Sequence, residues 1–64
     1  MTRVLIVDDE PLARARLAAL LAECEGCELV GSVADGEDAL GVLGELQPDV
    51  LLLNMNVPAL SGTA

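Results

Sequence analysis

The chain has 64 residues and a formal net charge of -8, and it contains no Phe, Tyr or Trp. Contacts to phosphates depend on clustered Lys and Arg, so this composition argues against nucleic-acid binding by the chain. No apolar stretch approaches the roughly 20 residues that a membrane-spanning helix needs. The opening apolar run is too short for a signal peptide and ends in acids. We therefore expect a soluble cytoplasmic protein with no membrane association and a small aliphatic core.

The opening segment combines a strand signal with a cluster of acids. Residues 3–7 are mostly aliphatic and are followed by Asp8, Asp9, Glu10 and Pro11. This run predicts a buried strand, and Pro11 suits the first position of a helix. The acids then lie where open α/β sheets bind ligands. Three crowded carboxylates repel one another, so the pattern predicts a small cation site. The alternative is a set of solvated acids that favour the helix N-terminus.

A first helix is predicted over residues 11–24. Arg14 and Arg16 fall outside its apolar stripe and are expected on a solvated face. Gly26 supplies a natural helix stop. The stripe repeats at three- and four-residue spacing and consists of Ala13, Leu17, Leu20, Leu21 and Cys24.

Cys24 and Cys27 form a Cys-Glu-Gly-Cys motif at the end of this helix. Redox-active motifs of this kind place a cysteine at a helix N-terminus, where the helix dipole favours the thiolate. Here the pair follows a helix and is flanked by glutamates, which disfavour the thiolate. A single pair without histidine also cannot complete a four-ligand zinc site. We therefore interpret the two cysteines as semi-buried thiols that end a helix and begin a strand.

A second strand and a second helix are predicted next. Residues 28–33 give a weak strand signal with a glycine inside it, which favours the edge of a sheet. Asp35 is the predicted N-cap of a helix over residues 36–46, and Asp38 lies at the capping-box position. Two glycines inside this helix each cost about 1 kcal/mol relative to alanine, so it should be the least stable element.

The last predicted strand, Val50–Leu53, is apolar throughout, which is typical of a strand buried in a parallel sheet. The order of elements is β-α-β-α-β. Right-handed crossovers then give a three-stranded parallel sheet in spatial order 2-1-3. This α/β arrangement corresponds to half of a flavodoxin-like doubly wound fold.

Three segments, in this order, resemble the receiver domain of bacterial two-component response regulators. They are residues 4–11 (VLIVDDEP), residues 48–53 (PDVLLL) and residues 58–62 (PALSG). Residues 8–14 resemble most closely the subfamily in which the receiver precedes a LytTR-type DNA-binding domain. The resemblance covers residues 1–64, which correspond to the first half of such a domain, and so implies a truncated receiver.

The resemblance also implies a set of site residues. Asp8 and Asp9 match the acidic pair that helps to hold Mg²⁺, and Asn56 matches the residue whose backbone carbonyl contacts the metal. Asn54 occupies the position of the aspartate that accepts a phosphoryl group from a histidine kinase. An amide oxygen can coordinate a metal but is too poor a nucleophile for that reaction. The resemblance thus implies weak Mg²⁺ binding and no catalytic residue, although both asparagines also suit plain turns.

The predicted function is that of a truncated, phosphorylation-incompetent receiver domain of a phosphorelay response regulator. The hydroxyl and lysine that sense the phosphoryl group in the family have no counterpart among the 64 residues. One alternative is an interaction or dimerisation module that keeps the receiver shape without phosphotransfer chemistry. A small enzyme that binds a phosphorylated ligand is disfavoured, because no glycine-rich phosphate loop follows the first strand.

The third predicted strand has an apolar edge that could pair with another chain. Val50–Leu53 carries no charge, and an unpaired apolar edge of this kind invites pairing with another chain. Self-association would also add the buried area that a small chain lacks. The sequence therefore predicts a homodimer with this strand and residues 53–60 in its interface.

Overall fold

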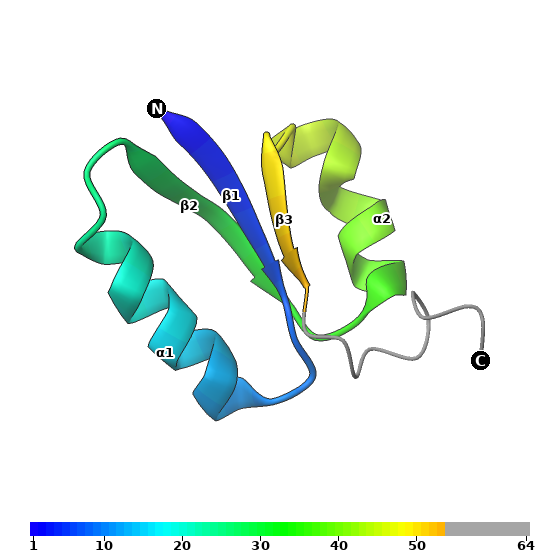
Figure 1. Ribbon diagram of the computed structural model, residues 1–64. Helices are drawn as coiled ribbons and strands as arrows, with labels where there is room; N and C mark the ends of the chain where they lie inside the picture. The colour runs from blue at the N-terminus through cyan, green and yellow to red at the C-terminus, as the bar shows by residue number, and fades with distance from the viewer. Residues whose placement is uncertain (54–64) are drawn as a thin grey trace.

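The computed structural model describes residues 1–53 and shows a parallel sheet flanked by two helices (Figure 1). Its elements are β1 (Thr2–Val7), α1 (Pro11–Ala22), β2 (Cys27–Val33), α2 (Gly36–Leu46) and β3 (Val50–Leu53). The strands lie in the order β2-β1-β3 and all pairs are parallel, which confirms the predicted topology and the edge position of β2. The structure is therefore a partial flavodoxin-like fold.

β1 is the central strand and forms the core. Its last four residues, Val4 to Val7, are at most 3% exposed. Its register runs from Thr2↔Cys27 to Val7↔Val33 on one side and from Val4↔Val50 to Val7↔Leu53 on the other. Burying one aliphatic side chain contributes about 1.5–3 kcal/mol, so this one strand supplies a large share of the stabilisation available to so small a domain.

The two faces of β1 pack against different partners. Leu5 and Val7 form a cluster with the buried Ala39 of α2, and the half-buried residues Val33, Val42, Leu43 and Leu46 pack against this cluster. Side chains alternate along a strand, so Val4 and Ile6 face the opposite side of the sheet. A right-handed crossover from β1 to β2 places α1 on that side.

α1 covers its face of the sheet less completely than the sequence predicts. None of its residues is buried, and of the predicted stripe only Ala13, Leu17 and Leu21 are half-buried. Arg14 and Ala18 are also half-buried, so the side of the helix toward the sheet is a narrow strip of partly covered residues. Leu20 is 64% exposed and Cys24 is also exposed, so their assignment to the packed stripe was wrong. The helix ends at Ala22, because residues 24–27 form a turn instead of a last helical turn.

α2 has the predicted bounds and the predicted cap. The side chain of Asp35 accepts a hydrogen bond from the backbone N–H of Asp38 at 2.8 Å. At the other end, Gln47 adopts a left-handed conformation with φ of 46° and donates its N–H to the carbonyl of Leu43 at 2.9 Å. Both ends therefore satisfy backbone groups that a helix leaves unpaired.

Gly31 lies where α2 approaches β2. A Cβ atom built at this position would lie 2.7 Å from Cδ1 of Leu46 and 3.0 Å from Cδ1 of Leu5. Glycine is therefore favoured here by packing, because any larger residue would displace the ends of the Leu46 and Leu5 side chains. The strand is also irregular nearby, because Val4 pairs with Leu29 and Leu5 with Gly31, which leaves Val30 as an extra residue.

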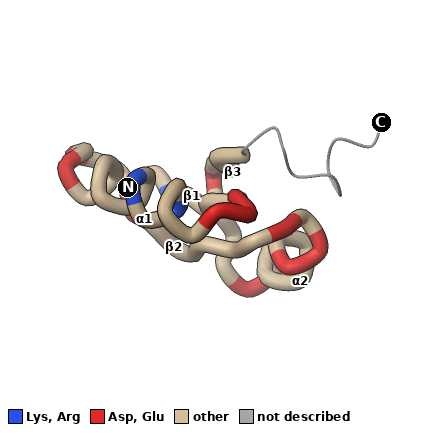
Figure 2. Tube along the Cα trace, turned by 90° about the horizontal axis from the view of Figure 1, so that it is seen from below, with Lys and Arg blue, Asp and Glu red and all other residues tan. Residues whose placement is uncertain are grey.

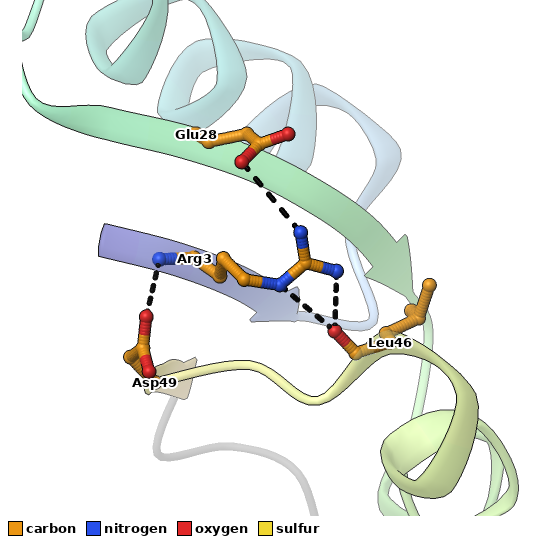
Figure 3. A network of polar contacts seen from close by, with 4 residues as sticks. All are labelled: Arg3, Glu28, Leu46 and Asp49. Atoms are coloured by element: carbon orange, nitrogen blue, oxygen red, sulfur yellow. Dashed lines mark hydrogen bonds and ion pairs between the residues drawn. The ribbon is translucent and has the colours of Figure 1, made fainter. Parts of the chain in front are cut away.

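Arg3 connects three segments at the amino end of the sheet (Figure 3). Its backbone N–H donates to Oδ2 of Asp49 at 2.8 Å, and its carbonyl accepts from the N–H of Asp49 at 2.7 Å. Its guanidinium donates from Nε and Nη2 to the carbonyl oxygen of Leu46, at 3.1 and 2.6 Å. Nη1 lies 3.6 Å from Oε1 of Glu28. A cation at the carboxyl end of α2 complements the helix dipole, so this residue holds α2 and the start of β3 against β1.

Charge is distributed unevenly over the described residues. The basic residues all lie in β1 and α1, whereas acidic residues lie in the turns, in β2 and in α2 (Figure 2). Neither of the two helices in residues 1–53 is long and apolar enough to cross a membrane.

Two glycine substitutions should shift the stability in opposite directions. Gly31→Ala is expected to lower the free energy of unfolding by about 1–3 kcal/mol, because the added methyl group overlaps Leu46 and Leu5. Gly44→Ala is the matched control, since nothing lies within 4 Å of its added Cβ, and it should raise stability by about 0.5–1 kcal/mol. Urea denaturation followed by circular dichroism at 222 nm measures both, and equal shifts would contradict the packing argument.

Removing the Arg3 side chain should destabilise the fold. Arg3→Ala is expected to lower the free energy of unfolding by about 1–2 kcal/mol, because the last carbonyl of α2 loses a charged donor that is itself partly exposed. Arg3→Lys should recover only part of this loss, since an ammonium cannot reproduce the two-donor contact. Arg16→Ala, at an exposed position on α1, serves as the control. Urea denaturation measures the free energy of unfolding of each variant. Comparable losses for Arg3→Ala and Arg16→Ala would refute the role assigned to Arg3.

Candidate functional site

The candidate site lies at the carboxyl end of β1. The pairing Val7↔Leu53 places the carboxyl ends of β1 and β3 side by side, and Asp8 and Asp9 directly follow Val7. The other two predicted site residues, Asn54 and Asn56, lie outside the described residues. The described part of the site is therefore the acidic pair and the backbone that holds it.

Asp8 is held in place from several directions. It is only 2% exposed, although its side chain is ionisable. Its N–H donates to the carbonyl of Val33 at 3.0 Å, which extends the contact between β1 and β2 by one residue. Its Oδ1 accepts from the N–H of Glu10 at 2.9 Å, which fixes the turn into α1. A buried polar group requires partners of this kind, and Asp8 has them.

Asp9 and Glu10 differ from Asp8 in their surroundings. Both are exposed, and Glu10 occupies the N-cap position of α1 without a side-chain cap hydrogen bond. Within residues 1–53, no three or more Asp, Glu, Cys or His residues come close enough together to hold a metal ion. A cation site built on Asp8 and Asp9 therefore needs further oxygen atoms, from residues after Leu53 or from water.

Arg14 belongs to the surroundings of this site, a role that was not predicted from the sequence. Its Nη1 donates to the backbone carbonyl of Asp8 at 2.6 Å, and the residue is half-buried. The expectation that it lies on a solvated face was wrong, because its guanidinium reaches back to the residue that follows β1. Its position one helical turn after Glu10 was the available signal, since side chains in the first turns of a helix can reach the preceding loop. The guanidinium offsets part of the negative charge of the acids.

A partial flavodoxin-like sheet with acids after its central strand is an arrangement that receiver-type signalling domains share with other doubly wound α/β proteins. The response regulator receiver domain family matches residues 4–64, and the chain belongs to this family. Its fold and its order of motifs agree with that assignment. Receiver domains of response regulators are in general signalling modules without enzymatic activity.

Several curated bacterial proteins are similar to the chain. The transcriptional regulatory protein BtsR of Salmonella typhi is 48% identical over 62 residues, which are 97% of this chain and 26% of that protein. The positive alginate biosynthesis regulatory protein of Pseudomonas aeruginosa is 48% identical over 60 residues, 92% of this chain and 24% of the relative. Protein-glutamate methylesterase/protein-glutamine glutaminase 5 of Myxococcus xanthus is 50% identical over 60 residues, 94% of this chain and 17% of the relative.

The extent of these matches limits what they imply. The chain spans about a quarter of the length of the first two relatives and less of the third. What the three have in common with this chain is therefore one region of each protein, while their names describe different activities. No solved structure matches the chain.

Proposed function

We propose that the chain serves as a receiver domain that cannot be switched by phosphorylation, because Asn54 stands at the phosphoacceptor position. The observation that carries this proposal is the parallel pairing of β1 with β3, which ends at Val7↔Leu53. Asp8 and Asp9 follow Val7 in the sequence, and Asn54 follows Leu53. Phosphoryl transfer to this position forms an acyl phosphate, which requires a carboxylate nucleophile. A carboxamide does not supply one at neutral pH.

The same site is proposed to bind Mg²⁺ weakly. Asp8 and Asp9 would supply carboxylate oxygens, Asn56 its backbone carbonyl, and Asn54 an amide oxygen. This donor set fits the ion, which prefers hard oxygen ligands and retains several waters. One oxygen of Asp8 already accepts the N–H of Glu10, so this carboxylate is oriented before any ion arrives. When bound, Mg²⁺ neutralises the acidic pair and any phosphoryl oxygens beside it.

The proposed context is a cytoplasmic two-component response regulator of bacteria, with a histidine kinase as the signalling partner of the parent family. Residues 8–14 favour the subfamily with a LytTR-type DNA-binding domain, and two of the relatives described above are named as regulatory proteins. DNA binding is not assigned to this chain, because two of its three arginines, Arg3 and Arg14, are held by hydrogen bonds within the fold. Neither membrane binding nor enzymatic activity is proposed for it.

Restoring the carboxylate should strengthen Mg²⁺ binding. Asn54→Asp is expected to bind the ion about tenfold more tightly or better, because a third negative charge faces a divalent cation. Isothermal titration calorimetry is suitable, since the chain has no aromatic side chain for fluorescence. Asn54→Gln, which keeps the amide, should bind like the unaltered chain. Asp9→Asn should weaken binding further, and equal affinities of Asn54→Asp and the unaltered chain would refute the proposed role of position 54.

Phosphoryl acceptance is tested separately with a small acyl phosphate donor. The unaltered chain, incubated with acetyl phosphate and Mg²⁺, should show no mass increase by intact-protein mass spectrometry. A phosphoryl group bound to the unaltered chain, on Asp8 or any other residue, would contradict the proposal.

Self-association through β3 is the second proposed function, and it corresponds to an interaction module with receiver shape. β3 is an edge strand of the sheet in residues 1–53, and Val50, Leu51 and Leu53 are 41%, 39% and 44% exposed. The free edge therefore combines unpaired backbone groups with apolar side chains that carry no charge. A second copy of the chain could pair with this edge and cover those side chains, as a homodimer.

A charge placed on this edge should weaken the dimer. The unaltered chain is expected to sediment as a dimer at micromolar concentration, and Val50→Lys should raise the dissociation constant about tenfold or more. Leu12→Lys adds the same charge at a residue that is 74% exposed on α1, and it should leave the constant unchanged. A folded monomer at micromolar concentration, or dissociation caused by Leu12→Lys alone, would overturn the proposed interface.

A further inference from the structure

The turn between α1 and β2 brings two thiols together. Cys24 follows α1 and Cys27 begins β2, and the N–H of Cys27 donates to the carbonyl of Cys24 at 3.3 Å. Gly26, at the third position of this four-residue turn, has φ of +88°, a conformation that favours glycine. The two Sγ atoms lie 3.2 Å apart. The chain turn itself therefore determines the contact between the thiols.

Contacts on both sides hold this turn. The N–H of Cys24 donates to the carbonyl of Leu21 at 3.0 Å, which ties the turn to α1. The N–H of Thr2 donates to the carbonyl of Gly26 at 2.7 Å, and Thr2 pairs with Cys27 in the sheet. The sulfur atoms must approach by only about 1 Å to reach the bonding distance of a disulfide, which is about 2.05 Å. Side-chain rotation can supply that movement while the turn is kept.

The thiols are also accessible. Cys24 is exposed and Cys27 is half-buried, so the earlier interpretation of two semi-buried thiols holds for Cys27 only. Within residues 1–53 they have no third metal-binding side chain close by, which disfavours a metal site. The pair lies at the amino ends of the strands, at the opposite end of β1 from Asp8 (Figure 1). It is therefore separate from the phosphoryl-transfer site.

We propose that Cys24 and Cys27 form an oxidative modification site that closes to an intramolecular disulfide by exchange with a low-molecular-weight disulfide. The Cys24 thiolate attacks one sulfur of the small disulfide, forms a mixed disulfide and releases the first small thiol. Cys27 then loses its proton and attacks Sγ of Cys24, which releases the second small thiol. The protein pair gives up two electrons and two protons, and the small disulfide is reduced to two thiols.

The surroundings of the pair make Cys24 the attacking residue. It is the more exposed of the two, so a small disulfide reaches it first. The hydrogen bond with Cys24 raises the pKa of the Cys27 thiol, and desolvation adds to this effect. The closed bond would tie the end of α1 to the start of β2. The site is thus suited to slow oxidation of the chain itself and differs from the catalytic motifs of oxidoreductases, whose cysteine lies at a helix N-terminus.

Equilibration of the whole chain in glutathione buffers, followed by acid quenching, alkylation and intact-mass analysis, tests this proposal. The unaltered chain should lose two hydrogens and take up no alkyl group, with no mixed disulfide accumulating. Cys24→Ser and Cys27→Ser should each retain a mixed disulfide with glutathione. Accumulation of mixed disulfide on the unaltered chain, or dimers linked between chains as the main product, would overturn the proposal.

A turn variant then tests whether the geometry of the turn is the cause. Gly26→Ala should lower the equilibrium constant for ring closure about fivefold, because a side chain disfavours positive φ. Glu25→Gln, which keeps the glycine, should change it less than twofold. If Gly26→Ala fails to fold, the equilibrium constant for ring closure is measured for the unaltered chain in concentrated urea instead. Unfolding the turn should lower that constant by a similar factor. An unchanged constant in the folded variant, or in urea, would show that the turn does not preorganise the pair.

Discussion

β1 is hydrogen-bonded along both edges and covered on both faces, and the rest of the described structure depends on this arrangement. Val4 to Val7 are almost completely removed from water, so the sheet is organised around one aliphatic strand. β2 and β3 are both edge strands here, and each obtains its hydrogen-bond partners from β1. Arg3 extends the same role to the polar groups at the amino end, where it joins the last carbonyl of α2 to the start of β3.

The candidate site inherits its geometry from the same strand. Asp8 continues β1 by one residue, and its N–H is still paired with Val33, so its backbone is fixed like that of a strand residue. Its side chain and carbonyl then bind the first turns of α1, through Glu10 and Arg14. A rigid first acid beside an exposed second acid is a useful arrangement for a hydrated cation, because only one carboxylate must adjust when the ion binds.

The outer surfaces of the described residues carry apolar side chains that a partner could cover. Large apolar side chains on α1, α2 and β3 stay exposed, among them Leu12, Leu20, Leu40 and Leu53. The absence of aromatic residues limits how much apolar area one side chain can bury, so each partner surface matters more for stability. Association through β3 and closure of the Cys24–Cys27 pair would act on opposite edges of the sheet, and neither requires the other.

The sequence by itself determined the element order, the parallel 2-1-3 topology, the bounds of α2 and β3 and the Asp35 cap, because aliphatic runs, turn residues and capping residues are local signals. It also located the acidic pair and the receiver family. Only the tertiary structure decided the roles of Arg3 and Gly31, since their partners lie on distant elements and leave no trace in spacing. For Arg14 the position near the start of α1 was a signal, but the contact with the carbonyl of Asp8 was seen only in the structure. The approach of the two thiols was decided in the same way, by a turn held between α1 and β1.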